Sequence, residues 1–221
     1  MPGQERERFR SDAKAEGETV VVGGYETHKA DGTPVPAKEA RWFKINLDRH
    51  NATWAYSKGE PFRSIASLEM LGTLLGIMLL LDPEDEGGQR SFRGELSVSG
   101  ATDNIGNRFV LSRLLTTKWP LVAFLSEISA QLESKNILFE MCWVPREQNQ
   151  EADAITNSDT EWLSADRCVA SSLDGLPFLV LPDLLTRGET FYNNQSVVNQ
   201  GIPDKGKYDP RSLRVRDPWD L

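Results

Sequence analysis

The sequence contains few cysteines and few histidines. Its two cysteines, Cys142 and Cys168, lie far apart in a chain of 221 residues, and neither has a neighbour at a metal-ligand spacing. So low a count excludes a disulfide framework and favours a reducing compartment. The only two histidines, His28 and His50, also lack such a spacing, so we expect no zinc site.

The chain also lacks an apolar leader and a clear membrane span. Residues 1–3 lead directly into alternating Glu and Arg at positions 5–8, which is not the pattern of a secretory signal. The most apolar stretch, residues 65–81, is slightly short for a membrane span and contains Glu69, so we expect a buried helix there. These features predict an intracellular protein, cytoplasmic or nuclear, that makes no membrane contact.

Positive charge is in deficit. The chain has 25 Lys and Arg against 33 Asp and Glu, a formal net charge of −8. This argues against nucleic-acid binding, because phosphates are contacted mainly by Lys and Arg. An acidic metal site would contribute several of the negative charges and would be neutralised by its ions, which weakens that argument without removing it.

The ordinary composition, 39% hydrophobic and 26% charged, predicts one globular core with a minor extension. The β-branched residues 19–22 predict a strand that enters a tight turn at Gly23-Gly24. Residues 40–47 alternate in polarity, which places Phe43, Ile45 and Leu47 on one face of another strand.

The same periodicities predict the elements that follow. Ser64 could cap the apolar helix after it. We then expect a short strand with Leu96 and Val98 that runs toward Asp103, helices at about 107–115 and from Pro120 onward, a strand at 137–144 and a short helix at 151–157. Residues 178–192 include an apolar helical stretch, and residues 195–221 are expected to be extended or partly disordered. The predicted division is a domain over residues 1–158 and a C-terminal extension over 159–221.

Three acidic residues occupy positions that attract attention. Glu69 lies within a very apolar helix, where an ionised carboxylate is costly unless it is paired or bound to metal, although it could face solvent at the helix rim. Asp103 follows a strand and could instead cap the next helix. Asp153 could be an ordinary surface carboxylate.

Together these residues resemble those of a known family. In residues 143–153, Trp-Val-Pro-Arg is followed by Asn149 and then by Ala-Asp, which resembles the end of retrotransposon ribonuclease H domains. Asp103-Asn104 is similar to the Asp-Asn motif of that family, and Ser67-Leu68-Glu69 resembles its first helix. The resemblance covers roughly residues 8–157. It implies an α/β, ribonuclease H-like fold with a mixed five-stranded sheet and flanking helices.

The family also requires an aspartate on its first strand. Asp12, within Arg-Ser-Asp-Ala-Lys at positions 10–14, resembles the Asp-Ala-Ser-like triplet of that strand, and Gly23-Gly24-Tyr25 resembles the turn that follows. Lys14 departs from the family, which usually has a small hydroxyl residue there. The alternative is that Asp12 is a solvated carboxylate on a flexible N-terminus.

The resemblance implies a metal-dependent endonuclease that hydrolyses the RNA strand of RNA–DNA hybrids. In the pattern of the family, Asp12 would bridge two Mg²⁺ ions, Asp153 would help to hold the ion that activates water, and Glu69 with Asp103 would hold the other. Mn²⁺ is expected to substitute for Mg²⁺. The implied partners are the hybrid and a reverse transcriptase module. The nearest basic candidates for hybrid contact are Arg113, Lys118 and Arg146.

Two alternatives remain open at the level of the sequence. A degenerate domain could have kept the fold and lost activity, serving a structural or hybrid-binding role. Such a reading would be favoured if Asp12 lay outside the acidic cluster. A 3′–5′ exonuclease of the same broad superfamily would also use four acids, but it usually has Tyr or His a few residues before the last Asp, where this chain has Asn149.

Overall fold

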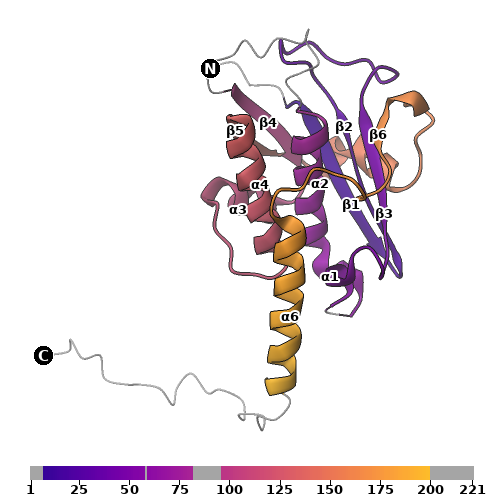
Figure 1. The fold of residues 1–221 in the computed structure, drawn as a ribbon. Coiled ribbons are helices and arrows are strands. Elements are labelled where there is room, and N and C mark those ends of the chain that lie inside the picture. Colours follow the sequence, from indigo (N-terminus) through magenta and orange to yellow (C-terminus); the bar gives the residue numbers. More distant parts are fainter. Residues whose placement is uncertain (1–6, 58, 82–95, 200–221) are drawn as a thin grey trace, which may run out of the picture.

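A computed structural model describes residues 7–57, 59–81 and 96–199. Its centre is a six-stranded mixed sheet with the strand order β5-β4-β1-β2-β3-β6 (Figure 1). The strands are β1 (Phe9–Glu16), β2 (Thr19–Glu26), β3 (Trp42–Leu47), β4 (Leu96–Thr102), β5 (Ile137–Trp143) and β6 (Cys168–Ala170). The first three are antiparallel, β4 is parallel to β1 and to β5, and β6 is parallel to β3. The predicted count of five strands is one too few, because the short β6 joins the sheet from beyond residue 158.

Helices cover both faces of this sheet. They are α1 (Thr53–Tyr56), α2 (Ile65–Leu79), α3 (Ile105–Arg113), α4 (Leu121–Lys135), α5 (Gln150–Thr156) and α6 (Leu181–Asn199), with single 3₁₀ turns η1 (Pro61–Ser64), η3 (Arg146–Gln148) and η4 (Ala165–Arg167). Gly72 of α2 lies against Val22, whereas Ile155 of α5 lies against Gly23. Neighbouring strand residues point to opposite faces, so α2 and α5 lie on opposite sides of the sheet.

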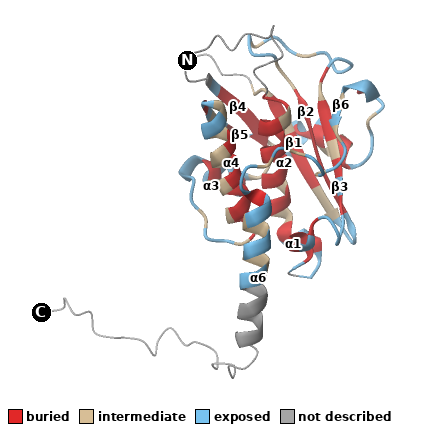
Figure 2. Ribbon diagram, in the orientation of Figure 1, coloured by how far each residue is buried: buried red, intermediate tan, exposed pale blue. Residues whose placement is uncertain are grey.

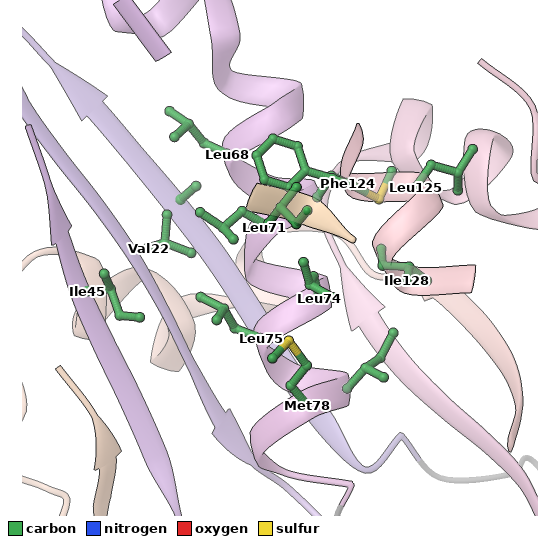
Figure 3. Close-up of a cluster of buried hydrophobic side chains, with 14 of the residues drawn as sticks. Val22, Ile45, Leu68, Leu71, Leu74, Leu75, Met78, Phe124, Leu125 and Ile128 are labelled. Carbon is green, nitrogen blue, oxygen red and sulfur yellow. The ribbon is translucent and has the colours of Figure 1, made fainter. Parts of the chain in front are cut away.

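The larger core lies between the sheet and α2, with α4 packed beside α2 and also in contact with β5 (Figure 3). Figure 2 shows α2 as buried along most of its length. The segment Pro61–Leu79 is long and apolar enough to cross a membrane by composition alone, but 67% of it is buried inside the protein. The predicted buried helix is confirmed. Ser64 occupies the position before α2, but its side chain makes no capping hydrogen bond.

The tight turn predicted at Gly23-Gly24 is wrong, because both glycines lie inside β2. A Cβ atom on Gly23 would lie 2.6 Å from Cγ2 of Ile155, and one on Gly24 would lie 2.7 Å from Cζ of Phe43. The glycines therefore allow α5 to approach one face of the strand and the ring of Phe43 to approach the other. Close packing, and not chain reversal, explains them.

A smaller apolar cluster lies on the α5 side of the sheet. Phe43, Ile45 and Leu47 are buried on the α2 side as predicted. Trp42 points to the opposite face and is also buried there. It belongs to the same cluster as Tyr25, Ile155 and Leu163. The N–H of its indole ring donates to the carbonyl of Ser164 at 2.8 Å. The second face of β3 is thus covered at its Trp42 end, whereas Lys44 is half-buried and Asn46 is exposed.

A fully buried carboxylate connects the C-terminal segment to this core. Glu127 of α4 accepts hydrogen bonds from the backbone N–H groups of Leu179, Val180 and Leu181 at 2.7–2.8 Å. The amide of Gln131 donates to the same carboxylate at 2.8 Å. These three N–H groups are at the start of α6, where backbone donors lack helical partners, so Glu127 supplies the acceptor that the helix needs.

The helical stretch predicted within residues 178–192 is confirmed as α6, which runs from Leu181 to Asn199. Residues 195–199, expected to be extended or disordered, are therefore helical, whereas residues 200–221 lie outside the described part of the chain. In Figure 1, α6 packs beside α4 and then projects beyond the body of the domain.

Candidate metal centre

Three acidic side chains from separate elements converge at one place. Carboxylate oxygens of Asp12, Glu69 and Asp103 all lie within 4.8 Å of one another. Asp12 lies within β1, Glu69 in the second turn of α2, and Asp103 directly after β4. Glu69 is partly buried and takes part in this cluster, so the alternative of a solvated residue at the helix rim is wrong for it.

The sheet explains why the two aspartates meet. Phe9 of β1 is paired with Gly100 of β4, and Arg10 is paired with Ala101, but β1 and β4 have no further paired residues. The same parallel register brings Asp12 level with Asp103 where the strands separate. Space for ligands is common where neighbouring parallel strands part, at their carboxyl ends.

Asp12 is a strand residue and not part of a flexible tail, so the alternative of a solvated terminal carboxylate is wrong. Its exposed fraction is 8%. Oγ1 of Thr156 donates a hydrogen bond to its Oδ2 at 3.0 Å. Burial, and after it the negative charge of Asp103, raises the pKa of Asp12 to about 6, with a smaller contribution from Asp153.

The pKa of Glu69 is shifted further than that of Asp12. Burial is the largest cause, and the charges of Asp103 and Asp12 add to it, raising the pKa of Glu69 to about 8. The hydroxyl of Thr102 donates to its Oε2 at 3.3 Å and only partly opposes this shift. Without a cation, the cluster therefore disfavours full ionisation.

Asp103 does not cap the following helix. Asn104 occupies the cap position of α3, and its side chain accepts the hydrogen bond from the backbone N–H of Asn107 at 3.1 Å. The backbone carbonyl of Asp103 accepts from the indole N–H of Trp143 at 3.0 Å, which fixes the turn after β4 against the end of β5. The carboxylate of Asp103 is left to face the other acids.

Asp153 lies beside the cluster but is not one of its three closest members. It is in α5, and its side chain is 41% exposed. Its Oδ2 accepts from the amide of Asn157 at 2.8 Å, and its Oδ1 lies 3.5 Å from a guanidinium nitrogen of Arg146. Its charge is still near enough to raise the pKa of Asp12. The structure thus brings three of the predicted acids together, with the more exposed Asp153 outside this group.

The donor set fits divalent metal ions that prefer oxygen. Carboxylates are the usual protein ligands of Mg²⁺, and a cation among them would relieve the mutual repulsion that raises two of the pKa values. Of the basic candidates, Arg146 contacts a site acid, whereas Arg113 and Lys118 are exposed at the end of α3 and in the loop after it.

The sequence did not identify two polar residues, Thr156 and Asn149, as residues that hold the acids or their elements in place. Thr156 is 2% exposed and bonds Asp12, as described above. Asn149 is 1% exposed, and its amide donates to the carbonyl of Ser11 at 3.3 Å, which ties the start of α5 to β1. Asn149 belonged to the motif of the resemblance. For Thr156 no signal in the sequence existed, because its partner is 144 residues away.

Comparison with solved structures finds ribonuclease H domains that are similar to this chain at low sequence identity. The N-terminal RNase H domain of a Mycobacterium tuberculosis protein is 17% identical with a TM-score of 0.44, covering 69% of this chain and 91% of that chain. RNase H1 of Halobacterium salinarum NRC-1 is 16% identical with a TM-score of 0.44, covering 68% and 94%. LC11-RNase H1, isolated from compost and solved in complex with an RNA/DNA hybrid, is 18% identical with a TM-score of 0.38, covering 69% and 95%.

No protein-family model matches the sequence, and no curated protein matches it either. The fold is defined by the sheet itself. Three antiparallel strands are followed by two that run parallel to the first, in the order 3-2-1-4-5, with α2 and α4 on one face and α5 on the other. The chain has an α/β, ribonuclease H-like fold, and this fold carries an acidic cluster that could bind metal.

Proposed function

We propose that this protein is a metal-dependent endonuclease of the ribonuclease H type, which hydrolyses the RNA strand of RNA–DNA hybrids. The observation that carries the proposal is the meeting of Asp12, Glu69 and Asp103 within 4.8 Å. A cluster of this kind is costly in a metal-free protein, since burial and mutual repulsion raise the pKa values of two of its members. Costly arrangements of titratable groups occur preferentially at functional sites.

Asp12, Glu69, Asp103 and Asp153 would hold two Mg²⁺ ions, for which Mn²⁺ could substitute. Such ions supply charge stabilisation to the attacking and leaving oxygens of a phosphodiester. Asp12 is the most enclosed of the four and is held in place by Thr156. Asp153 is the more exposed acid and lies where water can reach the site.

The proposed substrate is recognised by its shape and not by its sequence. Proteins contact RNA-containing duplexes through phosphates and 2′-hydroxyls. Arg146, whose side chain is 80% exposed beside Asp153, is placed to contact a phosphate. Because the protein carries a net charge of −8, we expect hybrid binding to depend on divalent metal ions more strongly than in a basic nuclease.

A retroelement origin is part of the same proposal. It is supported by the similarity of residues 143–153 to the end of retrotransposon ribonuclease H domains. On this proposal the chain would act next to a reverse transcriptase module inside the cell, in the cytoplasm or the nucleus. The C-terminal helix α6, which projects beyond the body of the domain in Figure 1, would be the element that meets such a module.

A degenerate, hybrid-binding module is the second candidate. One observation favours it: Asp153 is engaged by Arg146 and Asn157, and its carboxylate is not among the three that converge. The position of Asp12 inside the cluster argues for the enzyme. Catalysis therefore has to be measured directly.

The test is cleavage of a hybrid whose RNA strand is a closed circle, with Mg²⁺ or Mn²⁺ present. We expect internal cuts by the wild-type protein, abolished by EDTA, and a loss of more than about 100-fold for Asp103→Asn because a metal ligand is removed. The matched control is Asp174→Asn, which changes an exposed aspartate outside the cluster.

Binding of the hybrid without cleavage, with either metal, would contradict the enzyme and support the degenerate module. Cleavage of linear but not circular RNA would instead identify a 3′–5′ exonuclease.

A further inference from the structure

We infer that Thr156 is a positioning residue, which orients the carboxylate of Asp12 for metal binding. This inference rests on the proposed function, since it concerns the same site. Its basis is the hydrogen bond of 3.0 Å from Oγ1 of Thr156 to Oδ2 of Asp12. Thr156 is 2% exposed and Asp12 is 8% exposed, so water does not readily replace this bond.

The local fold holds Thr156 in place from several directions. Thr156 follows Asp153 by three residues in α5, so the two side chains share one face of the helix. A Cβ atom on Gly23 would lie 3.4 Å from Cγ2 of Thr156, which shows that the methyl group of Thr156 rests directly on β2. With its methyl group fixed against the sheet, the hydroxyl of Thr156 is directed toward β1.

The hydroxyl connects the two acids. Besides Asp12, Oγ1 of Thr156 lies 2.9 Å from the backbone carbonyl of Asp153. The hydroxyl has one proton and these two acceptors in reach, and an ionised carboxylate is a stronger acceptor than a carbonyl oxygen, so Thr156 donates to Asp12 when Asp12 is ionised. The bond then occupies one lone pair of Oδ2 and fixes the plane of the carboxylate, leaving its remaining lone pairs for cations.

Partners of this kind strongly affect metal sites. Groups that orient a metal ligand change metal affinity or activity by about 10–100-fold when they are removed. The effect of Thr156 should fall in this range, because it is the side chain that hydrogen-bonds Asp12 among the described residues, whereas Thr102 and Asn104 bond Glu69. The other hydrogen bond to Asp12 comes from the backbone of Ala13, which none of the variants changes.

The experiment compares Thr156→Val, Thr156→Ser and the wild-type protein by titration with Mn²⁺ alone, followed by calorimetry or electron paramagnetic resonance. Val keeps the shape and loses the hydroxyl, whereas Ser keeps the hydroxyl. We expect Thr156→Val to bind Mn²⁺ about 10–100-fold more weakly and Thr156→Ser to stay within a few-fold of the wild type. Cleavage of the hybrid should follow the same order.

Thr190→Val is the matched control. Thr190 is an exposed helical threonine of α6 whose hydroxyl bonds the carbonyl of Thr186 at 2.9 Å, so the same substitution is made away from the acids. We expect it to bind Mn²⁺ as the wild type does. If Thr156→Val does not fold, Thr156→Ala, which adds no apolar group beside Asp12, takes its place.

The outcomes separate this inference from the proposed function. Equal Mn²⁺ affinity of Thr156→Val and wild type would overturn the role of Thr156 alone, and so would an equal loss in Thr156→Ser, which retains the hydroxyl. Absence of Mn²⁺ binding by the wild-type protein itself would overturn both the inference and the metal-dependent function.

Discussion

Single residues at the site are governed by charge and burial. Asp12 and Glu69 have carboxyl pKa values raised to about 6 and about 8, and in both cases burial is the first cause and neighbouring acids the second. Each accepts a threonine hydroxyl and one further hydrogen bond, from the backbone of Ala13 to Asp12 and from Asn104 to Glu69, and these bonds only partly oppose the shift in pKa. A cation could offset the part of the shift that the hydrogen bonds do not.

The raised pKa values predict how stability depends on pH. In the unfolded chain the pKa values of Asp12 and Glu69 are near 3.8 and 4.5, so the folded state favours the protonated forms. Their contribution to stability is complete below about pH 4 and is lost as the pH rises through about 6 and then about 8. Without metal, the wild-type protein should lose stability over this window.

Urea denaturation in EDTA at about pH 5, 7 and 9 measures this effect. Glu69→Gln cannot ionise, so its stability should fall less with pH and should exceed that of the wild type at about pH 9. Glu133→Gln, an exposed change on α4, should keep the wild-type slope. Parallel curves for Glu69→Gln and wild type would contradict the shift at Glu69.

At the scale of elements, close approach between α5 and β2 places Asp153 and Thr156 near Asp12. The contact depends on Gly23, because a Cβ atom there would lie 2.6 Å from Cγ2 of Ile155. That γ-carbon belongs to a buried, β-branched side chain with little freedom to move. The helix itself would have to shift.

Gly23→Ala should therefore lower stability by about 1–3 kcal/mol, as overpacking does, and should also weaken Mn²⁺ binding by the protein that remains folded. Both can be measured by urea denaturation and metal titration. Adding Ile155→Ala removes the clashing carbon, so the double variant should be more stable than the sum of the single effects indicates.

Gly188→Ala is the control for overpacking alone. A Cβ atom on Gly188 of α6 would lie 2.1 Å from the ring of Trp119, in a contact between elements that carry none of the clustered acids. It should cost stability without changing the metal affinity of the folded protein. Equal metal affinity in Gly23→Ala and Gly188→Ala would show that the approach of α5 does not support the site.

At the scale of the whole molecule, residues beyond 158 are joined to the ribonuclease H-like core at two places. Strand β6 extends the sheet beside β3. On the α2 side of the sheet, Glu127 of α4 accepts three backbone hydrogen bonds at the start of α6. Leu181 is 3% exposed and belongs to the larger core. Glu127 is thus a buried acid with a structural role, in contrast to the clustered acids.

Glu127→Ala should destabilise the protein by about 3 kcal/mol or more, because hydrogen bonds to a charged acceptor contribute about 1.5–3 kcal/mol each and three backbone donors lose theirs. Urea denaturation measures the loss, and amide exchange should show it first at residues 179–181. Glu133→Ala, an exposed change on the same helix, should have little effect. Unchanged exchange at residues 179–181 would contradict this role of Glu127.

Much of the fold followed from the sequence because its signals are local. Alternating polarity in residues 40–47 predicted β3, and the apolar run at residues 65–81 predicted α2 as a buried helix. The helical spacing of Leu121, Leu125, Ile128 and Leu132 predicted α4. Asp12 was located through the resemblance and not through periodicity. Because both faces of β1 are covered, the strand lacks the simple alternation that would have revealed it.

Other features depend on contacts between distant residues, which no local pattern encodes. Two consecutive glycines such as Gly23 and Gly24 are typical of a turn. Only the packing of Ile155 and Phe43 against them shows why they lie within a strand. The sequence by itself determined which acids are present and the order in which they occur. The tertiary structure decided that Asp12, Glu69 and Asp103 converge while the more exposed Asp153 stays outside that group, because the separation of β1 from β4 and the packing of α5 on β2 set those distances.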